Sequence, residues 1–239
     1  MAVGLPYHKA RPLAVVYRGA SPLFDRLAAE VAAARLPLFP YPVEAEDPFK
    51  ALPCLAPLDF AGMVLEEALP PPEGVRLEAE AGQAGRVDLL VPGPLGPTGQ
   101  YTEGLALERW LATSFPGARA LWLGPLRPPL APFLRALGRV SVAAPSFAEG
   151  EGFLARLPER ARGHVAVRAQ ELGALALEAD LVIFAGGRLP LEILQPFHAL
   201  LALAPVERGV RERVLEVHGL ETLLDFRAKA ALEALGYAT

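Results

Sequence analysis

Residues 118–138 have the order of a phosphate-binding segment, in which a strand leads through a tight turn into a helix. The run ARALWLG (118–124) predicts a buried strand, and PLAPFLRALG (129–138) predicts an amphipathic helix. Glycines in such a turn let backbone N–H groups approach a dinucleotide pyrophosphate. Here the turn reads Gly124, Pro125, Leu126, Arg127, Pro128 and Pro129, and proline has no N–H to donate. The turn is therefore predicted to be a sound helix start and a poor phosphate cradle.

Two further features near predicted strand ends have a functional and a simpler interpretation. Arg127 could hold a phosphate through its side chain, or it could be a solvated loop residue. The pair Gly186-Gly187 follows a predicted strand at 180–187, at the end where α/β proteins form sites, or it makes an ordinary loop.

Other reactive side chains show little organisation. Cys54 is the only cysteine and lies in the apolar run ALPCLAPL, which predicts a buried, inert thiol. Glu66 and Glu67 are expected on a helix, where neighbours point about 100° apart, so they predict a solvated face and not a catalytic pair. Lys50 is expected at the surface, and Ser21 has no sequence context of an activated nucleophile.

The histidines do not predict a metal site. The four histidines have no spacing typical of metal ligands; they are His8, His164, His198 and His218. His218 precedes the last predicted helix and is expected to be partly exposed, with a position facing a cleft as the alternative.

The composition is that of a globular protein with a substantial core. The chain has 239 residues, of which 52% are hydrophobic, and a net charge of −4, which argues against nucleic acid or an anionic membrane as the main partner. The first twelve residues show no secretion signal, and no run of 18 apolar residues occurs, so we expect a cytoplasmic protein. The 25 prolines and only three lysines suggest a thermophilic source or a biased genome.

Strand and helix patterns alternate along the chain and predict an α/β fold. The alternation from 118 to about 205 predicts a parallel sheet covered by helices on both faces. The first hundred residues also alternate and end in a predicted hairpin at 86–100; residues 58–69 are expected to pass from a strand into a loop or short helix. A long amphipathic helix is predicted at 219–237. Two α/β domains fit this order best.

Several short strings, in this order, resemble motifs of the shikimate dehydrogenase family. The family's Ser-x-Ser-Pro turn is matched by Gly19-Ala20-Ser21-Pro22, and its Gly-Ala-Val-Asn-Thr by the string Gly85 to Leu89, with Asp88 at the asparagine. The family's Gly-x-Asn-Thr-Asp string is matched by Gly99 to Glu103, with Thr102 retained and Glu103 at the aspartate. The strand that carries the family's catalytic lysine corresponds to 60–69, which contains no lysine.

The resemblance implies an N-terminal α/β substrate domain, a Rossmann-like NADP-binding domain, and a C-terminal helix that returns to the first domain. The domains would be 1–103 with 216–239, and 104–215. Ser21, Thr102 and Asp88 would contact substrate, and Glu103 would take the place of the catalytic aspartate. Gly124 and Arg127 are the cofactor-site residues that remain, so NADP binding is expected to be weak or absent.

Three functions follow from this comparison. The first is a shikimate dehydrogenase-like protein that has lost the standard reaction and binds a small carboxylate in the cleft between its domains. The second is an active NAD- or NADP-dependent oxidoreductase with altered site residues. The third is a non-catalytic interaction protein. A homodimer is the default oligomer.

Overall fold

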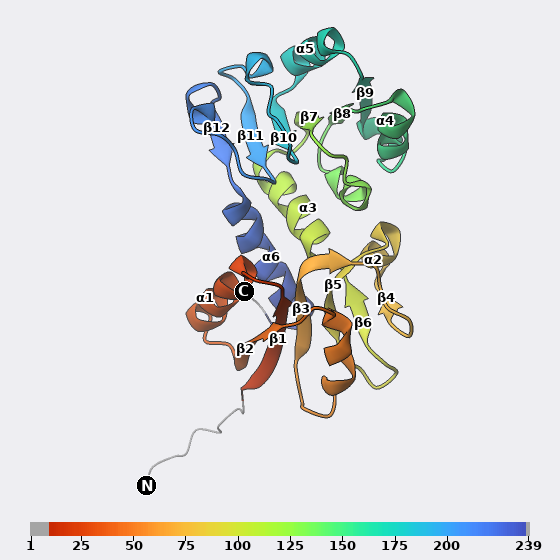
Figure 1. The fold of residues 1–239 in the computed structure, drawn as a ribbon, viewed down its shortest axis with the longest axis vertical. Helices are drawn as coiled ribbons and strands as arrows, with labels where there is room; N and C mark the ends of the chain where they lie inside the picture. Colours follow the sequence, from red (N-terminus) through yellow and green to blue (C-terminus); the bar gives the residue numbers. More distant parts are fainter. Residues whose placement is uncertain (1–9, 238–239) are drawn as a thin grey trace. The chain divides into compact units, whose positions relative to one another are not determined.

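The computed structural model describes residues 10–237, which form two compact units (Figure 1). The N-terminal unit contains the described chain up to Glu103 and from Arg227 onward, and the C-terminal unit is Gly104–Phe226. The expected two-domain α/β fold, with a last helix that ends in the first domain, is confirmed. None of the helices between residues 10 and 237 is long and apolar enough to cross a membrane.

The N-terminal unit is built on a mixed six-stranded sheet. In spatial order its strands are β2 (Leu38–Glu44), β1 (Arg11–Tyr17), β3 (Gly62–Leu69), β5 (Val87–Val91), β6 (Thr98–Gln100) and β4 (Arg76–Leu77). Strand β1 runs parallel to both β2 and β3, whereas β5 pairs antiparallel with β3 and β6. The carboxyl ends of β1 and β3 therefore lie at the same edge of the sheet.

Local sequence explains the first strand and helix of this unit. Residues Leu13 to Val16 are buried in succession, as expected for a strand covered on both faces. Helix α1 (Pro22–Ala33) begins with proline at a position that needs no N–H partner, and the Ser21 side chain caps it by accepting from Phe24 N at 3.1 Å. The 3-10 helix η1 (Pro48–Cys54) and helix α2 (Ala79–Ala84) complete the unit.

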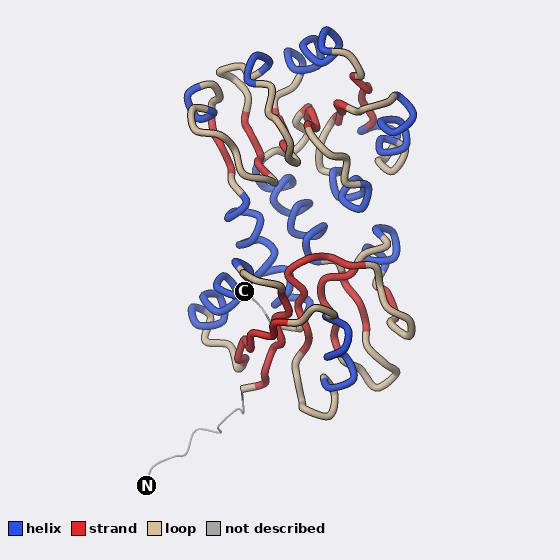
Figure 2. The backbone as a smooth tube through the Cα atoms, viewed as in Figure 1, coloured by secondary structure: helices blue, strands red, loops and turns tan. Residues whose placement is uncertain are grey.

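The C-terminal unit has an all-parallel sheet of six strands. Figure 2 draws its strands in red and the helical segments around them in blue. Their spatial order is β9 (Arg162–Ala166), β8 (Arg139–Ala143), β7 (Arg119–Leu123), β10 (Leu181–Phe184), β11 (Ala199–Ala202) and β12 (Glu216–His218). Counted along this part of the chain, the order is 3-2-1-4-5-6, the arrangement of dinucleotide-binding folds. Successive strands are added outward in opposite directions from β7 and β10, so the carboxyl ends of these two parallel strands mark the switch point of the sheet.

Helical segments precede, connect and follow these strands along the chain. They are α3 (Thr102–Ser114), η2 (Pro128–Leu134), α4 (Phe147–Leu154), η3 (Glu159–Ala161), α5 (Ala169–Glu178), η4 (Leu191–Ile193), η5 (Val210–Glu212) and α6 (Leu220–Ala234). The chain passes from the first unit to the second within α3, and it returns within α6.

Two expectations about elements are wrong. The segment 129–138 is not an amphipathic α-helix: it forms the short 3-10 helix η2, because Pro128, Pro129 and Pro132 remove the N–H groups that an α-helix requires. The segment 58–69 does not turn into a loop or helix: β3 continues to Leu69. Glu66 and Glu67 therefore lie on a strand, where successive side chains point to opposite faces.

Burial also differs from expectation at Cys54, whose thiol is exposed. It lies at the end of η1, and the following Leu55 takes the buried position instead. Lys50 is exposed, as predicted.

The second unit extends past residue 215, where the resemblance placed its end. Strand β12 pairs with β11, and the Phe226 ring stacks on Trp110 with centroids 6.2 Å apart, so the stretch 216–226 packs with the C-terminal unit. His218, at the end of β12, packs edge-on against Trp110 and Phe115 within the same unit.

Candidate functional site

Asp88 is buried in the N-terminal unit, where β5 directs its side chain at the start of helix α3. It is fully buried, and its carboxylate accepts from Thr102 N at 2.6 Å, Thr102 Oγ1 at 2.9 Å and Glu103 N at 2.8 Å. The first N–H groups of a helix have no partner within the helix, and a carboxylate there also interacts favourably with the helix dipole. Asp88 therefore caps α3 from a distant strand.

Arg227 of α6 balances this buried charge. Its Nη2 lies 3.2 Å from Asp88 Oδ2 and donates to the Leu65 carbonyl at 2.6 Å. Its Nη1 donates to the Glu66 carbonyl at 2.8 Å. Burial raises the pKa of the Asp88 carboxyl above its usual value, while Arg227 and the two backbone N–H groups act to lower that pKa. The guanidinium thus joins the α3 cap to the end of β3.

Glu103 and Tyr101 lie beside this pair. The Tyr101 hydroxyl donates to Glu103 Oε2 at 3.2 Å. Burial, together with the carboxylates of Glu103 and Asp88, raises the pKa of the Tyr101 phenol, so the hydroxyl keeps its proton and acts as a neutral donor. The structure therefore brings Asp88, Thr102 and Glu103 together, as the resemblance implied. Because Asp88 and Thr102 are fully buried and bonded to each other, their substrate contacts stay a prediction.

Ser21 lies at the other side of β3, at the end of the β1–α1 connection. Its hydroxyl donates to Glu66 Oε2 at 2.5 Å while the same oxygen caps α1. The serine that the resemblance assigned to substrate binding is thus next to a carboxylate of the chain itself.

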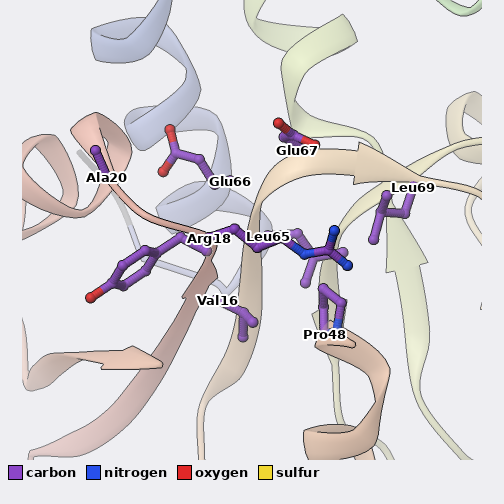
Figure 3. Close-up of a pocket in the computed structure, with 9 residues that line it drawn as sticks. Val16, Arg18, Ala20, Pro48, Leu65, Glu66, Glu67 and Leu69 are labelled. Carbon is purple, nitrogen blue, oxygen red and sulfur yellow. The ribbon is translucent and has the colours of Figure 1, made fainter. Parts of the chain in front are cut away.

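A cavity of about 140 Å³ opens at the carboxyl ends of β1 and β3 (Figure 3). Its walls include apolar side chains from both strands and from the start of η1, and its polar groups come from Arg18, Glu66 and Glu67. The Glu66 carboxylate points to the side of Ala20, whereas the Arg18 guanidinium lies toward Pro48 (Figure 3). One guanidinium nitrogen of Arg18 donates to the carbonyl of Glu46.

The switch point of the C-terminal unit is closed by a contact between two glycines. Gly124 follows β7 with φ +92°, and a Cβ built on it would lie 2.2 Å from the carbonyl oxygen of Gly186, which follows β10. The next residues are held in place by their own contacts: Trp122 Nε1 donates to the Pro125 carbonyl at 3.1 Å, and Arg127 Nη2 donates to the Ala185 carbonyl at 3.2 Å. Both predicted cofactor-site residues therefore lie at the switch point, with Arg127 bonded to the end of β10.

A cavity of about 500 Å³ adjoins this contact. Its lining residues are Gly124, Pro125, Leu126, Pro145, Glu149, Gly186, Gly187 and Arg188. Pro125, Pro128 and Pro129 offer no N–H here, and the loop leads into a 3-10 helix, so this turn has fewer backbone donors than a glycine-rich turn of the same length.

Solved structures with the same architecture decide the fold. The chain has the shikimate dehydrogenase fold. Shikimate 5-dehydrogenase of Listeria monocytogenes, solved with shikimate and NAD, superposes with a TM-score of 0.75 over 99% of this chain and 94% of that chain, at 13% identity. Quinate dehydrogenase of Corynebacterium glutamicum in complex with NAD superposes with a TM-score of 0.69 over 95% of this chain and 93% of that chain, at 15% identity.

The same fold also carries other chemistry. Ligand-free 5-ketofructose reductase of a Gluconobacter strain has a TM-score of 0.72 over 96% of this chain and 94% of that chain, at 14% identity. No protein-family model matches the sequence, and no match was found among curated proteins. At these identities the comparisons show the fold, and function depends on the side chains of this chain.

Sequence reasoning missed two residues of the N-terminal unit. Arg227 lies 139 positions after Asp88 with no local signal, and only the fold brings it to the carboxylate. Glu66 was assigned to a helix face. The alternation of side chains along a longer strand would have indicated that Glu66 and Glu67 face different surroundings.

Replacing Asp88 with alanine tests the buried pair. Asp88→Ala removes the carboxylate that pairs with the buried Arg227 guanidinium and leaves two helix N–H groups without their acceptor. We expect a loss of about 3–5 kcal/mol in unfolding free energy, measured by denaturant titration. Adding Arg227→Met should cost much less in the Asp88→Ala background than in the wild type. Asp180→Ala, which breaks the exposed pair with Arg119, is the control and should cost far less. Additive effects of Asp88→Ala and Arg227→Met would contradict the coupling.

A pair of glycine variants tests the switch-point contact. Gly124 and Gly187 both have positive φ, but a Cβ at Gly187 meets nothing within 4 Å. Gly187→Ala should cost about 1–2 kcal/mol from the left-handed backbone alone. Gly124→Ala should cost a further ~1–3 kcal/mol, because its methyl group collides with the Gly186 carbonyl. Thermal unfolding measures both, and equal losses would show that the close approach is relaxed in solution.

Proposed function

We propose that this chain uses the shikimate dehydrogenase fold without the standard NADP-dependent oxidation of shikimate, and that it binds a small molecule in its N-terminal unit. The observation that carries the proposal is the turn after β7. Three residues of this turn lack an N–H, and the turn leads into the 3-10 helix η2. The side-chain hydrogen bonds of Trp122 and Arg127 fix the path of the chain before η2. This geometry does not fit a pyrophosphate.

The residues at the end of β3 support the same conclusion. The resemblance places a catalytic lysine near 60–69, and this segment contains glutamates at its strand end instead. Lys50 in η1 and Lys229 in α6 are both exposed. Moving a proton to or from a reacting hydroxyl needs a titratable group within hydrogen-bond reach. Glu103, half-buried and bonded to Tyr101, is the carboxylate in this unit that retains the predicted role.

An altered oxidoreductase is the second candidate. The cavity of about 500 Å³ at the switch point favours it, because parallel α/β sheets bind nucleotides at that place. Relatives of the fold were solved with NAD, so a nicotinamide cofactor is the natural ligand to test.

Dinucleotide binding separates the two candidates. We expect NAD, NADP and their reduced forms at millimolar concentration to leave the melting temperature of the protein unchanged. A ligand at about 100 times its Kd would add about 2.7 kcal/mol, a readable shift. The Listeria monocytogenes enzyme, solved with NAD, is the positive control. Saturable NAD or NADP binding, followed by turnover of shikimate or quinate, would establish the second candidate.

A further inference from the structure

The cavity of the N-terminal unit lies where parallel strands usually present a ligand site. Strands β1 and β3 pair from Leu13–Gly62 to Val16–Leu65, and the cavity opens directly beyond this pairing. Its volume of about 140 Å³ is close to that of an apolar cavity known to hold benzene, about 150 Å³. Val16, Leu65 and Leu69 contribute apolar wall. The space therefore suits one small organic molecule with a hydrocarbon part.

Glu66 is held in position at the mouth of this space. Its Oε2 accepts the Ser21 hydroxyl, and Ser21 is itself fixed as the cap of α1. Its backbone carbonyl accepts Arg227 Nη1 at 2.8 Å, so the main chain at this residue is also fixed. The carboxylate is half-buried and makes no ion pair with any residue of the described chain, 10–237. Its side chain is thus a preorganised hydrogen-bond acceptor.

The other charged side chains of the lining are a second carboxylate and a guanidinium that points away from Glu66. Glu67, from the next position of β3, adds a second carboxylate to the lining. Arg18 also lines the cavity, but its guanidinium lies toward Pro48, away from the side to which Glu66 points, and it donates to the Glu46 carbonyl (Figure 3). A ligand carboxylate beside Ser21 would approach Glu66 and be repelled by it.

We infer that the cavity at the ends of β1 and β3 binds a small primary amine, whose ammonium group lies against Glu66 and whose hydrocarbon part lies against Val16, Leu65 and Leu69. An ammonium group has three donors, and Glu66 offers charged acceptor oxygens. The inference rests on the proposed function, because it names the ligand class of the same N-terminal unit. It also reverses the charge of the carboxylate ligand expected from the sequence.

Three probes of one shape test the charge. Benzylamine, benzyl alcohol and benzoate carry a cation, a neutral group and an anion on the same ring. Titration of the full chain at neutral pH, followed by protein NMR or calorimetry, should show saturable binding of benzylamine. The alcohol and benzoate should bind at least tenfold more weakly. Chemical-shift changes should concentrate at the ends of β1 and β3.

A matched pair of variants tests the residue. Glu66→Gln keeps an acceptor for Ser21 but removes the charge, and we expect at least a tenfold loss of benzylamine affinity with the melting temperature nearly unchanged. Asp25→Asn removes one exposed carboxylate of α1 and should leave the affinity unchanged. An equal loss in both variants would show a general effect of net charge and overturn the assignment to Glu66.

The remaining outcomes separate the two proposals. Tighter binding of benzoate than of benzylamine would overturn the amine inference and leave a small-molecule site for a carboxylate. Binding of none of the probes would also overturn it, while the dinucleotide titration on the same preparation decides independently whether the chain is an oxidoreductase. Benzylamine binding together with NAD binding and turnover would retain the site and reject the proposed loss of the reaction.

Discussion

A buried pair of opposite charges, Asp88 and Arg227, organises the N-terminal unit. A carboxylate without exposure to solvent is costly unless it is paired and hydrogen-bonded, and Asp88 has both kinds of partner. Through them it fixes the first turn of α3, and Arg227 carries the constraint to the carbonyls at the end of β3. A substitution at either residue therefore affects the helix start and the strand end together.

The hydrogen bonds of Arg227 also determine which way the Glu66 side chain points at the end of β3. Because Arg227 fixes the main chain at Leu65 and Glu66, the Glu66 side chain leaves the strand in a defined direction, where it accepts the Ser21 hydroxyl. The serine then serves two purposes, as the cap of α1 and as the partner of a carboxylate. Relatives with this fold were solved with shikimate or NAD. In this chain, the Glu66 carboxylate lies beside the turn that follows β1.

The C-terminal unit combines the strand order of a nucleotide-binding sheet with a proline-rich turn after β7. Its strand order and the glycine contact at the switch point need only backbone geometry, and both are present. Phosphate recognition needs, in addition, free N–H groups at a helix start. Prolines suit the backbone geometry of the turn because they fix its conformation. They oppose phosphate recognition because they have no N–H to donate. The strand order and the glycine contact therefore do not require the donors that phosphate recognition needs.

The sequence by itself determined the α/β class, the two-domain order, the parallel C-terminal sheet and the prolines of the β7 turn, since periodicity and proline chemistry act locally. It placed Ser21, Asp88, Thr102, Glu103 and Gly124 as the residues to examine. Only the tertiary structure decided that Asp88 caps α3, that Arg227 pairs with it, and that Ser21 faces Glu66. Each of these contacts joins residues far apart in the chain, and local pattern carries no information about which distant groups will meet. The length of β3 belongs to the same category, because its pairing with β5 extends the strand to Leu69. The 3-10 helix η2 does not, since the prolines that cause it stand in the sequence itself.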